Sequence, residues 1–221
     1  MDLYDVMRTT FAARNYTGEP ISDETLYEIL DTARFAPSGG NRQGNRVIIV
    51  RDIETRAAIG ELGIPAAKRY AAQVAVGENP WNSVDATQVS EEEIEATEPP
   101  QSMIQTFVAA SVVLVFVVDL KVVASMDQYL DRVGVISGAS IYPFVWNVLL
   151  ATREAGYGGT ITPQAVAEET KLRELLRIPE HFAVAAIVPI GKPVKQLTKL
   201  RRNAVSDIAV RERFDGAPFS G

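Results

Sequence analysis

Apolar residues recur three and four positions apart in several stretches of the first third of the chain, and this spacing predicts helices. The first helix is expected over residues 3–13, and the turn at residues 16–20 breaks its pattern. Ser22 is a good N-cap for a second helix that ends near Pro37. The chain therefore opens with two helices joined by a short turn.

Two more helices follow, separated from the first pair by a strand. Residues 45–51 form the first strand candidate. Asp52 is positioned to cap a helix that runs to Glu61, and a further helix is expected over residues 66–76.

Two other apolar runs have the character of strands. Residues 111–120, SVVLVFVVDL, are nearly continuously apolar and rich in valine, as in a central strand that is buried on both faces. Residues 183–191, AVAAIVPIG, form the third strand candidate. Helices thus outnumber strands and alternate with them, which predicts a three-layer α/β or α+β sandwich around a small mixed sheet.

Two segments between these strands have features of their own. Residues 127–155 include the small residues 138–140, which allow a neighbouring backbone to approach closely, and Pro143, which is expected to kink the segment. Residues 162–176 form a further helix, capped by Thr162 and carrying Pro163 at its first position. No internal repeat is visible, so residues 1–221 are treated as a single domain.

The region over residues 77–101 differs from the rest of the chain in composition. It is acidic, is rich in proline, glutamate, serine and threonine, and has little apolar periodicity. Two interpretations remain open, a lid over an active site or a surface excursion without a role. Trp81 is the residue in this region that disorder explains least well.

Composition excludes several classes of chemistry and of partner. The chain has no cysteine, so it has neither disulfides nor thiolate nucleophiles. A net charge of −6 argues against nucleic acid as a partner. The longest apolar stretch, near residues 112–118, is too short to cross a bilayer, and the N-terminus lacks the apolar core of a secretory signal. We therefore expect a cytoplasmic protein without a membrane partner.

Common catalytic and nucleotide-binding motifs are also missing. No dinucleotide fingerprint or P-loop follows a strand, and the segment 156–160, GYGGT, follows a helix instead. The single histidine, His181, and the acidic run 91–93 are better explained as an ordinary imidazole and a solvated face than as metal ligands, so no metal site is expected. By elimination, an enzyme with these residues would take its difficult chemistry from a cofactor.

Four motifs in order carry a specific resemblance. They are Arg14-Asn15-Tyr16, then ARFAPSGGNRQ, then GASIYPFVWNVLLATREAGYGGTITP, and finally KLRRNAVSDI near the end. Together they resemble the FMN-dependent nitroreductase family over nearly the whole chain apart from the acidic excursion. The resemblance implies an α+β sandwich that forms an intertwined homodimer, with two FMN sites built from both subunits.

The resemblance also assigns basic residues to the cofactor. Arg14 would reach the FMN phosphate or ribityl chain, and Arg201 or Arg202 would complete the phosphate site, since a guanidinium fits phosphate oxygens. The family pattern has an arginine and a serine or histidine where this chain has Thr10, Phe11 and Ala12. Arg8 is the candidate to replace that missing charge.

Two turns are implied to contact the flavin ring. The first would come from the partner subunit and contains Pro37, Ser38, Gly39, Asn41 and Gln43. A turn that merely ends the helix would explain Pro37 and Gly39, but it would leave Asn41 and Gln43 unexplained. In the second, backbone N–H groups would face the reactive edge of the flavin, and its residues are Gly158, Gly159, Thr160 and Ile161.

The implied activity is ping-pong hydride transfer. NADPH or NADH would reduce FMN at N5, and a nitroaromatic, quinone or related electrophile would then accept the electrons. Alternatives are other flavin chemistry in the same fold, such as enone or heterocycle reduction, dehalogenation or flavin breakdown, and a flavin-binding dimer without turnover. The segment 77–101 is the candidate lid that selects the acceptor.

Overall fold

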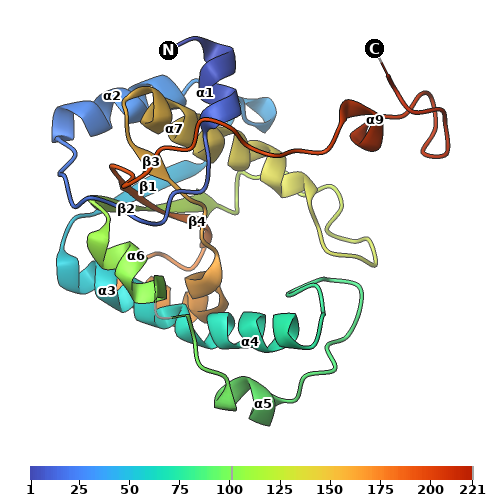
Figure 1. The fold of residues 1–221 in the computed structure, drawn as a ribbon, viewed down its shortest axis with the longest axis horizontal. Coiled ribbons are helices and arrows are strands. Elements are labelled where there is room, and N and C mark those ends of the chain that lie inside the picture. The colour runs from blue at the N-terminus through green and yellow to red at the C-terminus, as the bar shows by residue number, and fades with distance from the viewer. Residues whose placement is uncertain (101, 221) are drawn as a thin grey trace.

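The computed structural model describes residues 1–100 and 102–220, and Figure 1 shows a small sheet between two groups of helices. The four strands, in the spatial order β1-β2-β4-β3, are β1 Asn45–Val50, β2 Val112–Asp119, β4 Phe182–Gly191 and β3 Gly158–Gly159. One face of the sheet is covered by α1 Leu3–Thr9, α2 Asp23–Ala33 and α7 Tyr142–Glu154. The other face is covered by α3 Ile53–Leu62, α6 Ser102–Ala109 and α8 Glu169–Leu176. The predicted three-layer sandwich is confirmed.

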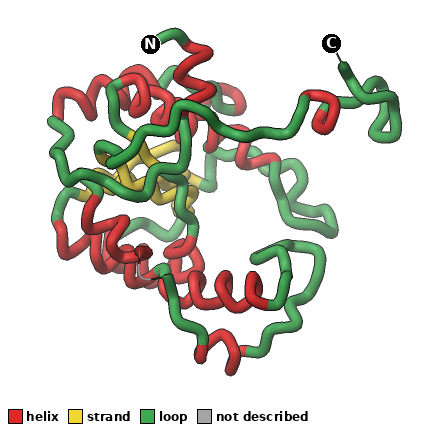
Figure 2. Tube along the Cα trace, in the orientation of Figure 1, coloured by secondary structure: helices red, strands yellow, loops and turns green. Residues whose placement is uncertain are grey.

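The remaining helices lie outside these layers or join them. Among the described residues they are α4 Ile64–Ala75, α5 Glu91–Ala96, α9 Val205–Ile208 and the short 3₁₀ helices η1 Gly39–Asn41, η2 Ile136–Ser140 and η3 Gln164–Glu168. Figure 2 shows the strands at the centre, with helices on both sides and long loops at the periphery. No helix in the described part of the chain combines the length and the apolar character needed to cross a membrane.

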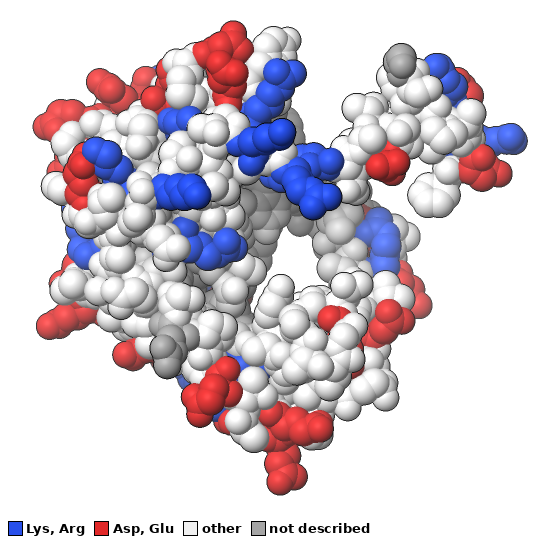
Figure 3. Space-filling model, viewed as in Figure 1, with Lys and Arg blue, Asp and Glu red and all other residues white. Residues whose placement is uncertain are grey.

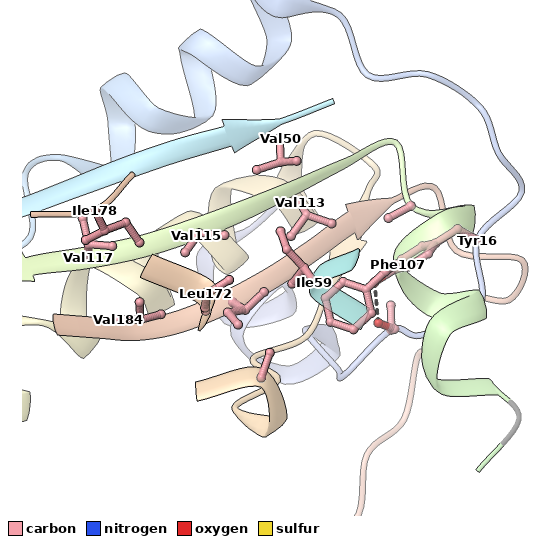
Figure 4. Close-up of a cluster of buried hydrophobic side chains, with 14 residues drawn as sticks. Tyr16, Val50, Ile59, Phe107, Val113, Val115, Val117, Leu172, Ile178 and Val184 are labelled. Atoms are coloured by element: carbon pink, nitrogen blue, oxygen red, sulfur yellow. Dashed lines mark hydrogen bonds between the residues drawn. The ribbon is translucent and has the colours of Figure 1, made fainter. Parts of the chain in front are cut away.

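The central strand β2 explains why the sheet is buried on both faces. Val113, Val115 and Val117 belong to one apolar cluster, which includes residues of α3, α6 and α8 (Figure 4). Leu114 and Phe116 belong to a second cluster, with residues of α2 and α7. Successive side chains of a strand point to opposite faces, so a continuous apolar run supplies both clusters at once.

Pairing within the sheet is antiparallel between all of its described strands, β1 with β2, β2 with β4 and β4 with β3. The parallel part of the expected mixed sheet is a single bridge between Ala12 and Gly159.

The predicted N-caps are confirmed, because Ser22 accepts a hydrogen bond from the N–H of Thr25 at 3.1 Å and Asp52 accepts one from the N–H of Thr55 at 2.8 Å.

Three local predictions are wrong. The first helix ends at Thr9 rather than at residue 13, because the following backbone pairs with β3. Pro143 lies in the first turn of α7, where the missing N–H costs no hydrogen bond, so it starts the helix instead of kinking it. Thr162 does not cap a helix, because its N–H donates to the carbonyl of Ile187 at 2.9 Å, and the expected helix is divided into η3 and α8.

A long loop between β2 and α7 is held by one carboxylate. Asp127 is 4% exposed and accepts hydrogen bonds from the N–H groups of Val135 at 2.7 Å and Ile136 at 3.3 Å. It also forms an ion pair of 2.8 Å with Arg132. The bond from Val135 and the contact with Arg132 lower the pKa of Asp127 from 3.8 to about 2.

Beyond β4 the chain leaves the body of the molecule as an extended arm, residues 192–220 (Figure 1). The arm carries α9 and ends in a small turn closed by a bridge between Val210 and Pro218. The side chain of Phe214 in this turn is fully exposed. An arm of this kind is consistent with the expected contact across a partner subunit, which stays a prediction.

Candidate functional site

The N-terminal segment and β3 together form one side of a large cavity. The N–H of Ala13 donates to the carbonyl of Gly159 at 3.1 Å, which fixes the segment that carries Arg14 against β3. Arg14, Thr160 and Ile161 all line a cavity of about 800 Å³, which we call the large cavity. Three residues that the sequence assigned to one cofactor are therefore brought together.

Tyr16 anchors this segment to the sheet. Its hydroxyl lies 2.6 Å from the carbonyl oxygen of Ala13 and 2.9 Å from that of Pro189, and burial raises its pKa above the ordinary value for tyrosine. Gly191 leaves room for the ring, because a Cβ atom there would lie 2.8 Å from it. Tyr16 thus has a structural task beside the exposed Arg14.

The backbone of the second predicted turn presents unused donors. The N–H groups of Thr160 and Ile161 donate no hydrogen bond to any described residue. Thr160 is only 3% exposed, and a buried backbone N–H without an acceptor is rare in folded proteins. Both residues line the large cavity, so their unpaired N–H groups are candidates to donate to a bound ligand.

The two glycines before them have a task in packing, and their predicted contact with the flavin stays a prediction. Gly158 and Gly159 form the edge strand β3, and a Cβ atom at Gly158 would lie 2.8 Å from Pro193 and 3.0 Å from Ala13. At Gly159 it would lie 3.0 Å from the carbonyl oxygen of Pro189. Both glycines therefore allow neighbouring chain segments to pack closely.

A second cavity, of about 460 Å³, collects basic residues from the two ends of the chain. Arg8, Lys199 and Arg202 line it, and we call these three residues the basic cluster. Gln196 holds the arm against α1 by donating to the carbonyl of Thr9 at 3.1 Å. Figure 3 shows Lys and Arg gathered beside α1 and the start of the arm.

No described carboxylate compensates the charges of this basic cluster. None of the three residues forms an ion pair with a carboxylate in the described ranges 1–100 and 102–220. Three such cations close together repel one another in the absence of an anion. The arrangement, in a protein of net charge −6, fits a phosphate group.

The turn expected to come from the partner subunit has an unusual backbone. Gly40, Asn41 and Gln43 have φ angles of 61°, 53° and 49°, which is the left-handed region. The turn is held by Ser38, which accepts from the N–H of Gln43 at 3.0 Å, and by Gly39, whose N–H donates to the hydroxyl of Ser140 at 3.0 Å. Left-handed residues other than glycine cluster at functional sites.

This turn does not meet the other predicted site residues within one chain. None of the described residues that line the large cavity or surround the basic cluster belongs to residues 37–43. Arg201 also lies outside both sets, whereas Arg202 is in the basic cluster.

The acidic region contains more order than the sequence pattern indicated. Helix α5 begins with a capping box in which Ser90 accepts from the N–H of Glu93 at 3.3 Å and Glu93 accepts from that of Ser90 at 2.8 Å. Ile94 packs against Ala72 of α4. The S-x-x-E sequence of this capping box was available as a signal. Gln101, the last residue of the predicted excursion, lies outside the described residues.

Glu78 organises the loop before α5. It accepts hydrogen bonds from the N–H of Gln88 at 2.6 Å, from the hydroxyl of Thr87 at 2.7 Å and from the amide of Gln73 at 3.0 Å. The bonds from Gln88 and Thr87 hold the pKa of Glu78 below its ordinary value of 4.5. We call residues 77–100 the lid segment, after one of the two roles predicted for this region, which stays a prediction.

Comparison with known proteins identifies the chain. The family model described as Nitroreductase family matches residues 7–192. The chain belongs to the nitroreductase family. The match includes the N-terminal segment, both turns and all four strands, and it ends at the start of the arm.

Relatives of this nitroreductase-family chain include oxidoreductases. A protein of Thermus thermophilus described as NADH dehydrogenase is 27% identical over 188 residues, which cover 83% of this chain and 82% of the relative. Oxidized iodotyrosine deiodinase, solved with FMN and 3-iodo-L-tyrosine, has a TM-score of 0.68 at 21% identity, covering 96% of this chain and 99% of that chain. The NADPH:FMN oxidoreductase of Vibrio harveyi, complexed with NAD+, has a TM-score of 0.69 at 18% identity, covering 96% and 78%. At these identities the two structures share the fold.

The family resemblance inferred from four motifs is thereby confirmed, as is the fold class. Lys199 was not among the predicted site residues, although the motif KLRR contains it. Its position became apparent only from the contact of the arm with α1. Tyr70, Met103 and Phe107, which also line the large cavity, carry no motif that would identify them.

Proposed function

We propose that this nitroreductase-family protein is an FMN-dependent oxidoreductase that takes electrons from NADPH or NADH and delivers them to a nitroaromatic, a quinone or a related electrophile. The observation that carries the proposal is the position of Arg14 beside the unpaired N–H groups of Thr160 and Ile161 in one large cavity. When bound, FMN supplies two-electron redox chemistry that the side chains of the protein lack.

The residues of the chain fit the two ends of this cofactor. The basic cluster of Arg8, Lys199 and Arg202 offers three uncompensated cations to a phosphate. Arg14 lines a different cavity from the basic cluster, which supports a role at the ring or ribityl chain rather than at the phosphate.

At the ring, the chain contributes electrostatics and position. The N–H groups of Thr160 and Ile161 can donate to a polar edge of the ring, and Arg14 can stabilise negative charge there. The donors are fixed by the backbone, so they need no reorganisation during the reaction. The site therefore works without a titratable acid or base from this turn.

A second copy of the chain completes the proposed site. The turn of residues 37–43 lies apart from both cavities of its own chain, while its left-handed backbone suits close approach to a flat ligand. We propose a homodimer in which this turn of one subunit reaches the ring held by its partner. The extended arm supplies additional surface for that contact.

The test is spectroscopic. The purified protein, supplied with FMN, is expected to retain a yellow flavin that NADPH or NADH bleaches without oxygen and that para-nitrobenzoate or a quinone recolours. The double variant Arg8→Gln/Arg202→Gln is expected to bind FMN about a hundredfold more weakly or worse, since bonds to charged groups contribute about 1.5–3 kcal/mol each. Lys171→Gln/Arg177→Gln is the matched control, because it also removes two exposed positive charges and neither residue lines a cavity or belongs to the arm.

Each outcome has a definite reading. A protein that takes up no FMN would overturn the proposal. A yellow protein that neither NADPH nor NADH bleaches would support the alternative of a flavin-binding dimer without turnover. Equal loss of FMN in the control variant would show that the basic cluster is not the phosphate site.

A further inference from the structure

The lid segment and α4 form an aromatic wall of the large cavity. Trp81 of the lid segment and Tyr70 of α4 both line the cavity, and they are 50% and 49% exposed. Large aromatic side chains gain most from being buried against another flat apolar surface. Two of them, half exposed on one cavity, provide a surface for a planar ring.

Trp81 is held in place before any ligand arrives. Its backbone N–H donates to the side-chain oxygen of Gln73 at 3.2 Å. The guanidinium carbon of Arg69 lies 4.9 Å from the centre of the indole ring. Its backbone has a φ of 57°, a conformation that such contacts must maintain. Because Arg69 occupies one face of the indole, only the other face and the edges remain for a ligand.

The charges around this wall disfavour cationic ligands. Among the described residues that line the large cavity, Arg14 is charged and none is an aspartate or glutamate. The other polar groups are neutral and include Ser102, Thr106 and Gln164. Burying an ammonium group here would leave it without a counter-ion and close to a guanidinium, which is costly.

We infer that the acceptor of this protein is a planar aromatic compound that is neutral or anionic. The wall of Trp81 and Tyr70 holds its ring, and the described lining, which has Arg14 and no carboxylate, selects against acceptors with a cationic ammonium group. This inference rests on the proposed function for the identity of the cavity as the acceptor site. It separates the substrate class of this chain from that of the deiodinase relative of similar fold, which was solved with an amino acid, 3-iodo-L-tyrosine.

The experiment measures binding, independently of turnover. The chain has two tryptophans, so the variant Trp146→Phe leaves Trp81 as the only indole reporter. FMN-saturated protein in this background is titrated with para-nitrobenzyl alcohol, para-nitrobenzoate and para-nitrobenzylammonium, three quenchers that differ in charge. We expect the alcohol and the benzoate to quench Trp81 with a Kd at least about tenfold lower than that of the ammonium compound.

Three further variants test the cause of this preference. Gln164→Glu adds a carboxylate of nearly the same shape to the cavity lining and is expected to remove or reverse the preference. Gln105→Glu adds the same charge on the exposed side of α6, outside the lining, and is expected to leave the preference unchanged. Tyr70→Leu is expected to weaken binding of all three compounds about equally, by roughly three- to tenfold.

The outcomes separate this inference from the proposed function. If the ammonium compound binds as tightly as the other two, or if none of them quenches Trp81, the inference is wrong even when the flavin is reduced normally. If the order of affinities holds but neither NADPH nor NADH reduces the flavin, the proposed function fails and the ligand class stands.

Discussion

The backbone N–H of Ala13 donates a hydrogen bond of 3.1 Å to the carbonyl of Gly159. This bond joins the segment that carries Arg14 to the strand that precedes Thr160, two parts of the chain that are far apart in sequence. The relative position of the guanidinium and the unpaired N–H groups therefore depends on how closely these two backbones can approach.

Replacing Gly158 with alanine tests this approach. The added Cβ would lie 2.8 Å from Pro193 and 3.0 Å from Ala13, so the segments must separate. We expect a loss of about 1–3 kcal/mol in the free energy of unfolding, measured with denaturant. Gly134→Ala is the control, because its Cβ would have only ordinary contacts, at 3.5 Å or more. Equal stability of the two variants would contradict the proposed close packing.

Replacing Arg14 with alanine tests the assignment of this residue to the cofactor. Arg14 is exposed, and its side chain forms one long hydrogen bond to a described residue, 3.4 Å to the carbonyl of Ala12, so the fold should be retained. FMN should bind about ten- to hundredfold more weakly, as expected for a lost bond of about 1.5–3 kcal/mol to a charged group. FMN titration by flavin fluorescence measures the change. Full flavin occupancy at wild-type concentrations would remove the assignment.

The lid segment should loosen in acid. The pKa of Glu78 is lower in the folded protein than its ordinary value of 4.5, so its hydrogen bonds stabilise the lid segment at neutral pH. That stabilisation is lost as the pH falls below 4.5 through the folded pKa. With Trp146→Phe as background, the emission of Trp81 should change over this range. Glu78→Gln should show the acid-type emission already at pH 7, and an emission independent of both pH and this substitution would refute the role of Glu78.

The loop before α7 should also lose stability as the pH falls, but at a lower pH than the lid segment. The pKa of Asp127 is about 2 in the folded protein against an ordinary 3.8, so the carboxylate stabilises the fold above pH 3.8. Asp127→Asn should therefore be less stable than wild type at pH 7, and the difference should shrink as the pH falls from 3.8 toward 2. Denaturant unfolding at several pH values measures it. Gln128→Glu, at the exposed neighbouring residue, serves as the control for a local change of charge.

Local features of the fold could be predicted because short-range chemistry decides them. The alternating faces of β2 and the N-caps Ser22 and Asp52 are properties of a few adjacent residues, and all are confirmed. The errors at residues 10–13 and at Thr162 have one cause. In both cases the backbone N–H found a partner in a distant strand, and helical periodicity contains no information about such a partner.

The candidate site was only partly predictable for the same reason. Family motifs predicted Arg14, Thr160 and the turn of residues 37–43, and the structure brings Arg14 and Thr160 to one cavity. The motifs did not distinguish Arg202 from Arg201 or identify Lys199. That distinction depends on how the arm crosses α1, which is a tertiary contact. The aromatic wall of Trp81 and Tyr70 likewise depends on how the lid segment packs on α4.

The lid segment is attached to the rest of the protein through one helix. From residue 77 to residue 97 its polar contacts with other described elements are made to α4 alone, through Lys68, Arg69 and Gln73. A segment tied to a single peripheral helix can be exchanged or lengthened without disturbing the sheet or the basic cluster. Under the proposed function, replacing this one segment would change the choice of acceptor and leave the proposed FMN site unchanged.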